Sequence, residues 1–68
     1  MKAGGDLNKL KTTRQKAGLT QEQVAEKADI STRSYQQYES GEREPKVTTA
    51  ILIAETLNST VEYLFKEL

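Results

Sequence analysis

Apolar residues recur along the chain at the three- and four-residue spacing of amphipathic helices, in five short segments separated by turn residues. The first segment is predicted to begin near Asp6 and to end before Gly18, which serves as its stop. Arg14 falls on the apolar face of this helix. The apolar members of that face are Leu7, Leu10, Ala17 and Leu19.

The next two segments each begin with a cap pattern. Thr20 followed by Gln23 has the form of a capping box, which predicts a second helix beginning at Thr20. Ser31 is the predicted N-cap of a third helix, which runs to about Ser40 and ends at Gly41. The expected buried face of the second helix consists of Val24, Ala25 and Ala28. The expected hydrophobic staples are Leu19 with Val24 and Ile30 with Tyr35.

Two further helices complete the pattern. The sequence "GEREP", residues 41–45, is a loop by composition, and Asn58 is predicted to end the helix that follows it. A fifth helix, capped by Ser59 or Thr60, is predicted from Val61 to about Lys66. The predicted apolar stripe of the fourth helix is Val47, Ala50, Ile51, Ala54 and Leu57, and that of the fifth is Val61, Leu64 and Phe65.

These segments predict one all-α domain. We find no alternating strand pattern and no internal repeat, so residues 6–68 are expected to form a compact five-helix domain after a disordered N-terminus, residues 1–5. A chain of 68 residues buries only about 60% of the surface that its unfolded form exposes. The core is therefore expected to be thin.

The composition narrows the chemistry that such a domain can perform. The chain has no Cys and no His, so disulfides and thiolate or imidazole metal sites are excluded, and an enzyme reading has little support. The longest apolar run, residues 50–54, is far too short to cross a bilayer. We therefore expect a cytoplasmic protein with no membrane contact, no metal, no cofactor, no catalytic residue and no small-molecule substrate.

The polar face of the third helix is the main candidate site. Gln can pair with adenine and Arg with guanine in the major groove, and Thr can offer its hydroxyl or its methyl group. An ordinary solvated helix face remains the alternative, although such a face would be richer in Glu and Lys. The residues of this polar face, within about 140° of one another, are Thr32, Arg33, Gln36 and Gln37.

The charge distribution leaves two functions open. Net charge is zero, but residues 1–34 carry seven Lys or Arg against four Asp or Glu, while residues 35–68 carry three against six. The N-terminal half could therefore face an anion such as DNA, although so small an asymmetry is common on solvated surfaces. The zero total and the acidic C-terminal half instead favour a protein-interaction module.

Two helices joined by a short turn, the second capped and polar outward, form the helix-turn-helix arrangement. The stretch "RQKAGLTQEQVAEKADISTRSYQQYESGEREP" with the later "ILIAETLNSTVEYLF" resembles the lambda-repressor-like, or Cro and repressor type, helix-turn-helix family. The resemblance covers about four-fifths of the chain. It implies a five-helix fold and a sequence-specific double-stranded DNA-binding regulator of transcription, a small repressor or switch. The alternative is a protein-interaction module with the same fold.

The resemblance also implies roles for single residues. The base contacts would come from Thr32, Arg33 and Gln37, with Gln36 as a base or flanking contact. The phosphate contacts would come from Gln21, Ser34, Arg43 and Lys46, and Gln21 would also buttress the third helix. Arg14 and Glu39 match a pair in which an Arg of the first helix meets a Glu at the end of the third, and Arg14's place on the apolar face indicates that the pair is buried.

This sequence departs from the family pattern at several positions. Glu42 and Glu44 flank Arg43 in a loop that is often basic, which should repel phosphate and lower affinity. Tyr35 and Tyr38 stand where smaller aliphatic residues are common, and we interpret them as core and edge packing with solvated hydroxyls, or otherwise as phosphate donors.

One domain has a single recognition helix, so we expect a two-fold homodimer on an inverted-repeat operator. Leu52 lies off the apolar stripe of its helix, and the last helix is more apolar than its length requires. The expected dimer interface is Val61, Phe65, Leu68 and Leu52.

Overall fold

The computed structural model describes residues 9–65, and the regular elements within this range are all helices. They are α1 (Lys9–Lys16), α2 (Gln21–Lys27), α3 (Thr32–Ser40), α4 (Val47–Thr56) and α5 (Val61–Phe65). The predicted all-α fold with five helices is confirmed. The expected helix start near Asp6, the apolar Leu7, the disordered residues 1–5 and the interface residue Leu68 lie outside the described residues.

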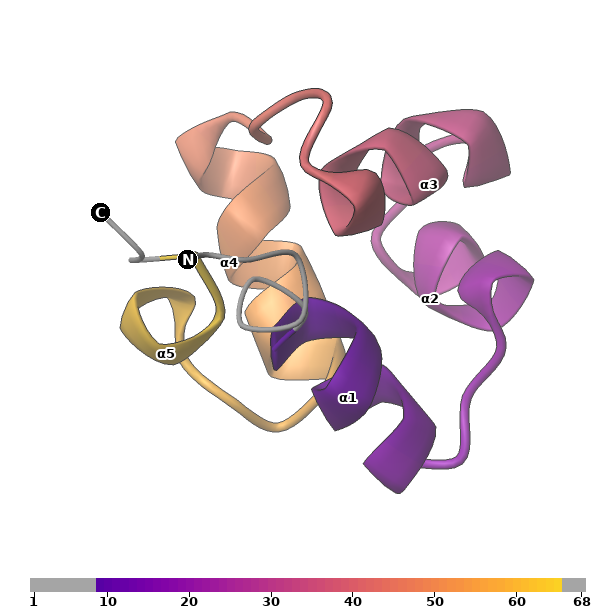
Figure 1. The fold of residues 1–68 in the computed structure, drawn as a ribbon, viewed down its shortest axis with the longest axis vertical. Helices are drawn as coiled ribbons and strands as arrows, with labels where there is room; N and C mark the ends of the chain where they lie inside the picture. Colours follow the sequence, from indigo (N-terminus) through magenta and orange to yellow (C-terminus); the bar gives the residue numbers. More distant parts are fainter. Residues whose placement is uncertain (1–8, 66–68) are drawn as a thin grey trace.

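The five helices are arranged around α4. Helix α2 packs against α3 and α4, and α5 packs against α1 and α4. Figure 1 shows α4 between α5 on one side and α2 with α3 on the other. The arrangement leaves α3 on an outer edge, with one face on α2 and the opposite face free.

The buried core draws on all five helices. Its largest fully buried side chains are Tyr35, Ile53 and Val24, which come from three different helices. The remaining buried apolar residues are Leu10, Ala25, Ala28, Ala50, Ala54, Leu57 and Leu64. Leu19, Ile30, Tyr38, Val61 and Phe65 pack against this core while partly exposed. The predicted buried face of α2, residues 24, 25 and 28, is confirmed.

The four connections after α1 to α4 share one local structure. Each has a residue of positive φ within two positions of the helix end: Gly18 at 76°, Asp29 at 61°, Gly41 at 84° and Asn58 at 57°. The amide of the following residue donates to a carbonyl five residues back, as in the 2.9 Å bond from Glu42 N to Gln37 O. This is the Schellman motif, which satisfies the last carbonyls of a helix and turns the chain sharply. Asp29 is the one member of this set not expected from the sequence, and Asp tolerates this conformation better than most residues.

The predicted helix starts are also observed. Thr20 Oγ1 accepts from Gln23 N at 3.1 Å while Gln23 Oε1 accepts from Thr20 N at 2.8 Å, which completes the capping box. Ser31 Oγ accepts from Ser34 N at 3.0 Å at the start of α3. Caps and Schellman turns together account for helices of only five to ten residues.

Three predicted apolar positions are wrong. Ala17 is exposed because α1 ends at Lys16 and Ala17 lies in the turn. The predicted stripe of α4 included Val47 and Ile51, but these side chains are 73% and 42% exposed, and Ile53 is fully buried instead. Helix α4 carries apolar residues on most of its circumference, so helical spacing alone fits more than one face. Packing between α2 and α5 selects the face that contains Ile53.

No helix within residues 9–65 combines the length and the apolar character needed to cross a membrane.

The corrected face of α4 predicts a difference between two similar substitutions. Ile53→Val should lower the free energy of unfolding by about 0.5 to 1.5 kcal/mol, because it deletes a buried methylene group and leaves a cavity. Ile51→Val is the matched control and should change it by less than about 0.5 kcal/mol, since this side chain is partly in solvent. Urea unfolding followed by circular dichroism measures both. Equal losses for the two variants would contradict the observed rotation of α4.

Candidate nucleic-acid interface

Helices α2 and α3 form a helix-turn-helix unit. The connection, residues 28–31, contains the Schellman turn at Asp29 and the N-cap Ser31. Ile30 N donates to Ala25 O at 3.0 Å, and the Ile30 side chain packs against the core. Local hydrogen bonds and one apolar anchor therefore set the direction in which α3 leaves the turn.

The free face of α3 is polar. Arg33, Gln36 and Ser40 are exposed, and the partly exposed members of the helix include Thr32, Ser34 and Gln37. A shallow depression on this face is lined by Arg33, Gln36, Gln37, Ser40 and Glu42. The structure therefore brings Arg33, Gln36 and Gln37, three of the four residues expected to contact bases, to one depression. Thr32, the fourth, is the first residue of the helix, directly before Arg33, and does not line the depression.

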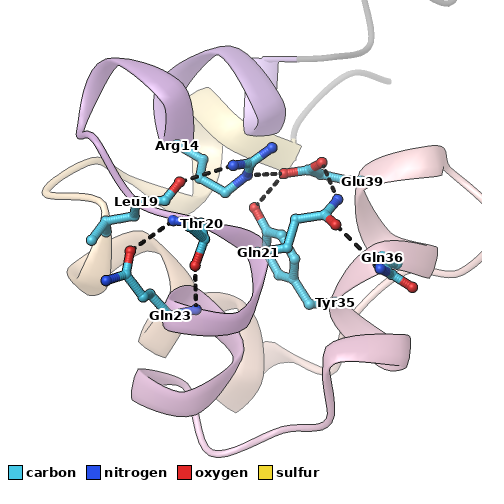
Figure 2. A network of polar contacts seen from close by, with 8 residues as sticks. All are labelled: Arg14, Leu19, Thr20, Gln21, Gln23, Tyr35, Gln36 and Glu39. Carbon is cyan, nitrogen blue, oxygen red and sulfur yellow. Dashed lines mark hydrogen bonds and ion pairs between the residues drawn. The ribbon is translucent and has the colours of Figure 1, made fainter.

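The opposite side of α3 is held by a buried carboxylate. Arg14 Nε donates to Glu39 Oε2 at 2.6 Å, and the two side chains are only 11% and 6% exposed. Tyr35 Oη donates to the same oxygen at 2.8 Å, and Gln21 Nε2 donates to Glu39 Oε1 at 2.9 Å (Figure 2). Arg14 Nη1 also donates to Leu19 O at 2.8 Å. Glu39 thus collects one donor from each of α1, α2 and α3.

Tyr35 differs from expectation in one respect. It is a core residue, as predicted, but its hydroxyl is buried against Glu39 and is not solvated. A phenol supplies both a large apolar ring and a donor, so one side chain can fill the core and satisfy the carboxylate four residues later. The spacing from Tyr35 to Glu39, one helical turn, was the sequence signal for this bond.

The network shifts the pKa values of its members. Burial by itself raises the pKa of Glu39, but hydrogen bonds from Arg14, Gln21 and Tyr35 outweigh it and hold the pKa below its ordinary value. Burial, together with the bond to Glu39, raises the pKa of Tyr35 well above its ordinary range. The hydrogen bond to Glu39 raises the pKa of Arg14. A carboxylate with a lowered pKa stabilises the fold at neutral pH, and this contribution is lost as pH falls through the folded-state pKa.

Gln21 connects this network to the polar face of α3. Its Nε2 donates to Glu39, and its Oε1 accepts from Gln36 Nε2 at 3.2 Å. Both ends of the Gln21 amide therefore contact α3, which is the buttressing arrangement that the resemblance implied. Nε2 carries a second hydrogen, so the bond to Glu39 does not exhaust its donors.

The loop after α3 places its two cations differently. Arg43 Nη1 donates to Gln37 Oε1 at 2.9 Å, and its guanidinium lies 5.6 Å from the ring centroid of Tyr38. Lys46 is exposed at the N-cap of α4, without a side-chain cap bond. Glu42 and Glu44 are exposed on either side of Arg43. The contact between Arg43 and Gln37 was not expected from the sequence, because a loop position does not reveal which turn of α3 it folds back onto.

The described residues expected at a dimer interface, Leu52, Val61 and Phe65, belong to α4 and α5 and not to α3. Leu52 is 40% exposed on α4, whereas Val61 and Phe65 of α5 are half-buried against the core. Three further apolar side chains are exposed without having been expected to be: Val47, Ile51 and Tyr63. The Tyr63 ring lies 5.0 Å from Lys9 Nζ, which links α5 to the start of α1.

The buried pair predicts strong coupling between Arg14 and Glu39. Arg14→Met or Glu39→Met alone should each lower the free energy of unfolding by about 3 to 5 kcal/mol, because the remaining charged group stays buried without its partner. The double variant should lose less than the sum, since apolar replacement of both is often nearly neutral. Urea unfolding of the wild type, the two single variants and the double variant measures this double-mutant cycle. Additive losses of a few tenths of a kcal/mol would instead indicate an exposed pair.

Comparison with known proteins agrees with this geometry. A helix-turn-helix family model matches residues 10–64. Two curated relatives come from Bacillus subtilis (strain 168). The uncharacterized HTH-type transcriptional regulator YqaE is 40% identical over 57 residues, or 84% of this chain and 49% of the relative. The HTH-type transcriptional regulator ImmR is 38% identical over 56 residues, or 82% of this chain and 44% of the relative.

The chain spans about half the length of the curated relatives it matches. No solved structure matches it significantly. The family model covers all of α2, α3 and α4 and most of α1 and α5, including the capped turn and the buried Arg14 and Glu39 pair. The chain therefore belongs to the helix-turn-helix family of the Cro and repressor type.

Proposed function

We propose that this chain is a sequence-specific double-stranded DNA-binding regulator of transcription that reads the major groove with α3. The observation that carries the proposal is the division of α3 into two faces. Tyr35 and Glu39 are buried and tie the helix to α1 and α2, while Arg33, Gln36 and Gln37 surround a shallow depression on the free face. A helix held firmly on one side can present donors and acceptors to base edges on the other.

The size of α3 suits this role. An α-helix with its side chains is about 10 to 12 Å across, and the major groove of B-DNA is about 12 Å wide, so a helix such as α3 can enter it. We assign the base contacts to Thr32, Arg33 and Gln37, with Gln36 beside them. The proposed phosphate contacts are Gln21, Ser34, Lys46 and, through its remaining donors, Arg43.

The charge of the loop after α3 favours sequence-specific DNA binding over non-specific DNA binding. Residues 42–46 contain Glu42, Arg43, Glu44 and Lys46, so their net charge is zero (two cations minus two anions). Phosphate contacts from this loop supply little non-specific affinity, and base contacts must supply more of the total. We propose that the protein acts as a small repressor or switch by occupying an operator, a role that requires no catalytic step and no cofactor.

We also propose that two copies bind one operator with two-fold symmetry. The domain measures 32 × 23 × 20 Å, and a single nine-residue recognition helix contacts only a few base pairs. Helix α5 lies on the far side of α4 from α3 (Figure 1). These two helices carry Leu52, Val61 and Phe65, which supports placing the interface there. Leu68 is also part of the proposed interface, on the basis of the sequence alone. A different protein partner on this surface is the alternative that the test below distinguishes.

The proposal separates base readers from phosphate binders. Arg33→Ala should lower affinity for the operator by about 1 to 3 kcal/mol and leave a scrambled duplex nearly unaffected, because a bidentate base contact is lost. Lys46→Ala is the matched control, and it should weaken both duplexes similarly and lower the salt slope by about 1. Titrations at several salt concentrations measure both effects. If Arg33→Ala weakened the two duplexes equally, the base-reading role of Arg33 would be lost.

The dimer proposal predicts a footprint with two half-sites. Recognition helices of such dimers lie about 34 Å apart, so the half-site centres should be separated by about 10 base pairs. Scrambling one half-site should sharply reduce affinity, and sedimentation should show two chains on the intact site. Leu52→Glu should lower affinity for the intact site and leave binding to a single half-site unchanged. One chain on a single half-site, with affinity indifferent to the second, contradicts the dimer.

A further inference from the structure

Gln37 and Arg43 are joined on the free face of α3 in a way that constrains the Gln37 amide. Arg43 Nη1 donates to Gln37 Oε1 at 2.9 Å. A guanidinium has five N–H donors and no acceptor, so the Gln37 atom that meets it must be the carbonyl oxygen. Turning the amide over would set the Nε2 donors against the guanidinium donors. The bond therefore directs Oε1 toward Arg43 and leaves Nε2 as the free end of the side chain.

Arg43 is itself held in place by two further contacts with the end of α3. Its backbone N donates to Gln37 O at 3.3 Å, next to the Schellman bond from Glu42 N to the same carbonyl. Its guanidinium lies 5.6 Å from the Tyr38 ring centroid, within the range of a cation–π interaction. Gly41, with a φ of 84°, makes the turn that returns the loop to this position. The side chain that orients Gln37 is thus anchored before any ligand arrives.

The acidic neighbours of Arg43 do not compete for its guanidinium in the structure. Among residues 9–65 the recorded ion pair is that of Arg14 with Glu39, so neither Glu42 nor Glu44 holds Arg43. Both glutamates nevertheless lower the local positive potential. Arg43 is therefore less suited to general attraction of phosphate than an isolated loop cation, and its closest polar partner is a base-facing side chain.

The orientation of the Gln37 amide, with Oε1 or Nε2 toward the DNA, decides which base edges it can recognise. The usual pairing of Gln with adenine uses Oε1 to accept from the N6 amino group and Nε2 to donate to N7. Because Oε1 is turned toward Arg43 and uses one of its two lone pairs there, the free end of the Gln37 side chain is Nε2 with its two donors. The major-groove acceptors that match are O6 and N7 of guanine, O4 of thymine and N7 of adenine. Adenine and cytosine also present an amino donor, N6 or N4, which would meet the Nε2 donors without an acceptor.

We infer that Arg43 is a positioning residue that makes Gln37 read hydrogen-bond acceptors in the major groove, guanine or thymine, in preference to the amino groups of adenine and cytosine. The inference rests on the proposed function of α3 and specifies the base class for that surface. Arg43 acts here through Gln37, and any phosphate contact that it makes is separate.

Gln36 provides an internal comparison. Its Nε2 donates to Gln21 Oε1 at 3.2 Å, and Gln21 is oriented by the Glu39 carboxylate. This chain of bonds does not include Arg43. A change at Arg43 should therefore alter the base preference that depends on Gln37 and leave the preference that depends on Gln36 intact.

The test begins with selection of duplexes from a random DNA pool by the wild-type chain and by Gln37→Ala. The base pair at which wild type shows a sequence preference and Gln37→Ala shows none is the Gln37-dependent pair. At this pair we expect wild type to favour guanine or thymine by about 5- to 150-fold over the other bases. Arg43→Ala should reduce this ratio toward the Gln37→Ala value, and the Gln37→Ala, Arg43→Ala double variant should show no further loss.

Two control variants separate positioning from loss of charge. Lys46→Ala should lower affinity for every duplex and keep the ratio at the Gln37-dependent pair. Gln36→Ala should change discrimination at a different pair. Urea unfolding of each variant checks that the fold is retained, which is expected because Arg43, Lys46 and Gln36 are exposed.

The outcomes that contradict the inference are distinct from those that contradict DNA binding. Arg43→Ala weakening all duplexes equally, with the ratio intact, would show that Arg43 binds phosphate only. A Gln37-dependent base pair that requires an adenine or cytosine amino group would show that Oε1, and not Nε2, faces the base. An enriched site unaffected by Gln37→Ala would also overturn the inference while leaving the proposed function in place. Failure to enrich any sequence would overturn both.

Discussion

The packing of α1, α2 and α3 depends on the hydrogen bonds that satisfy the buried carboxylate of Glu39. A carboxylate removed from water is costly unless donors replace its hydration, and here Arg14, Gln21 and Tyr35 supply them from three helices. Arg14 and Gln21 fix α1 and α2 relative to the last turn of α3, and Tyr35 adds a donor from α3 itself. Since the largest apolar side chains are few in so small a domain, this polar network supplies orientation that a thin core cannot.

The same network connects the interior to the outer face of α3. Gln21 bonds Glu39 with one end of its amide and Gln36 with the other, so the orientation of an interior group is passed to a surface group. Arg43, an exposed residue of the loop, donates to Gln37 and orients its amide independently of this network. The side-chain amides of Gln36 and Gln37, which are neighbours in the sequence, therefore have different hydrogen-bond partners. The recognition proposed for this surface depends on those partners as well as on the identity of the exposed residues.

Short helices and sharp turns make this geometry possible in 68 residues. The Schellman turns at Gly18, Asp29, Gly41 and Asn58 end four helices within one or two residues and reverse or deflect the chain. The turn at Gly41 has a second consequence, because it brings Arg43 back over the last turns of α3. The Schellman motif that ends α3 therefore also determines which side chain lies beside Gln37.

The sequence by itself determined the elements and their ends, because caps and Schellman turns are made by bonds between residues at most five apart. Thr20, Ser31 and Gly41 could be identified in this way, and the helix-turn-helix unit with its polar face followed from them. Only the tertiary structure decided that Ile53 and not Ile51 is buried, because α4 is apolar on most sides and its neighbours select the face. The buried hydroxyl of Tyr35 and the partner of Arg43 were likewise decided by contacts that local spacing leaves open.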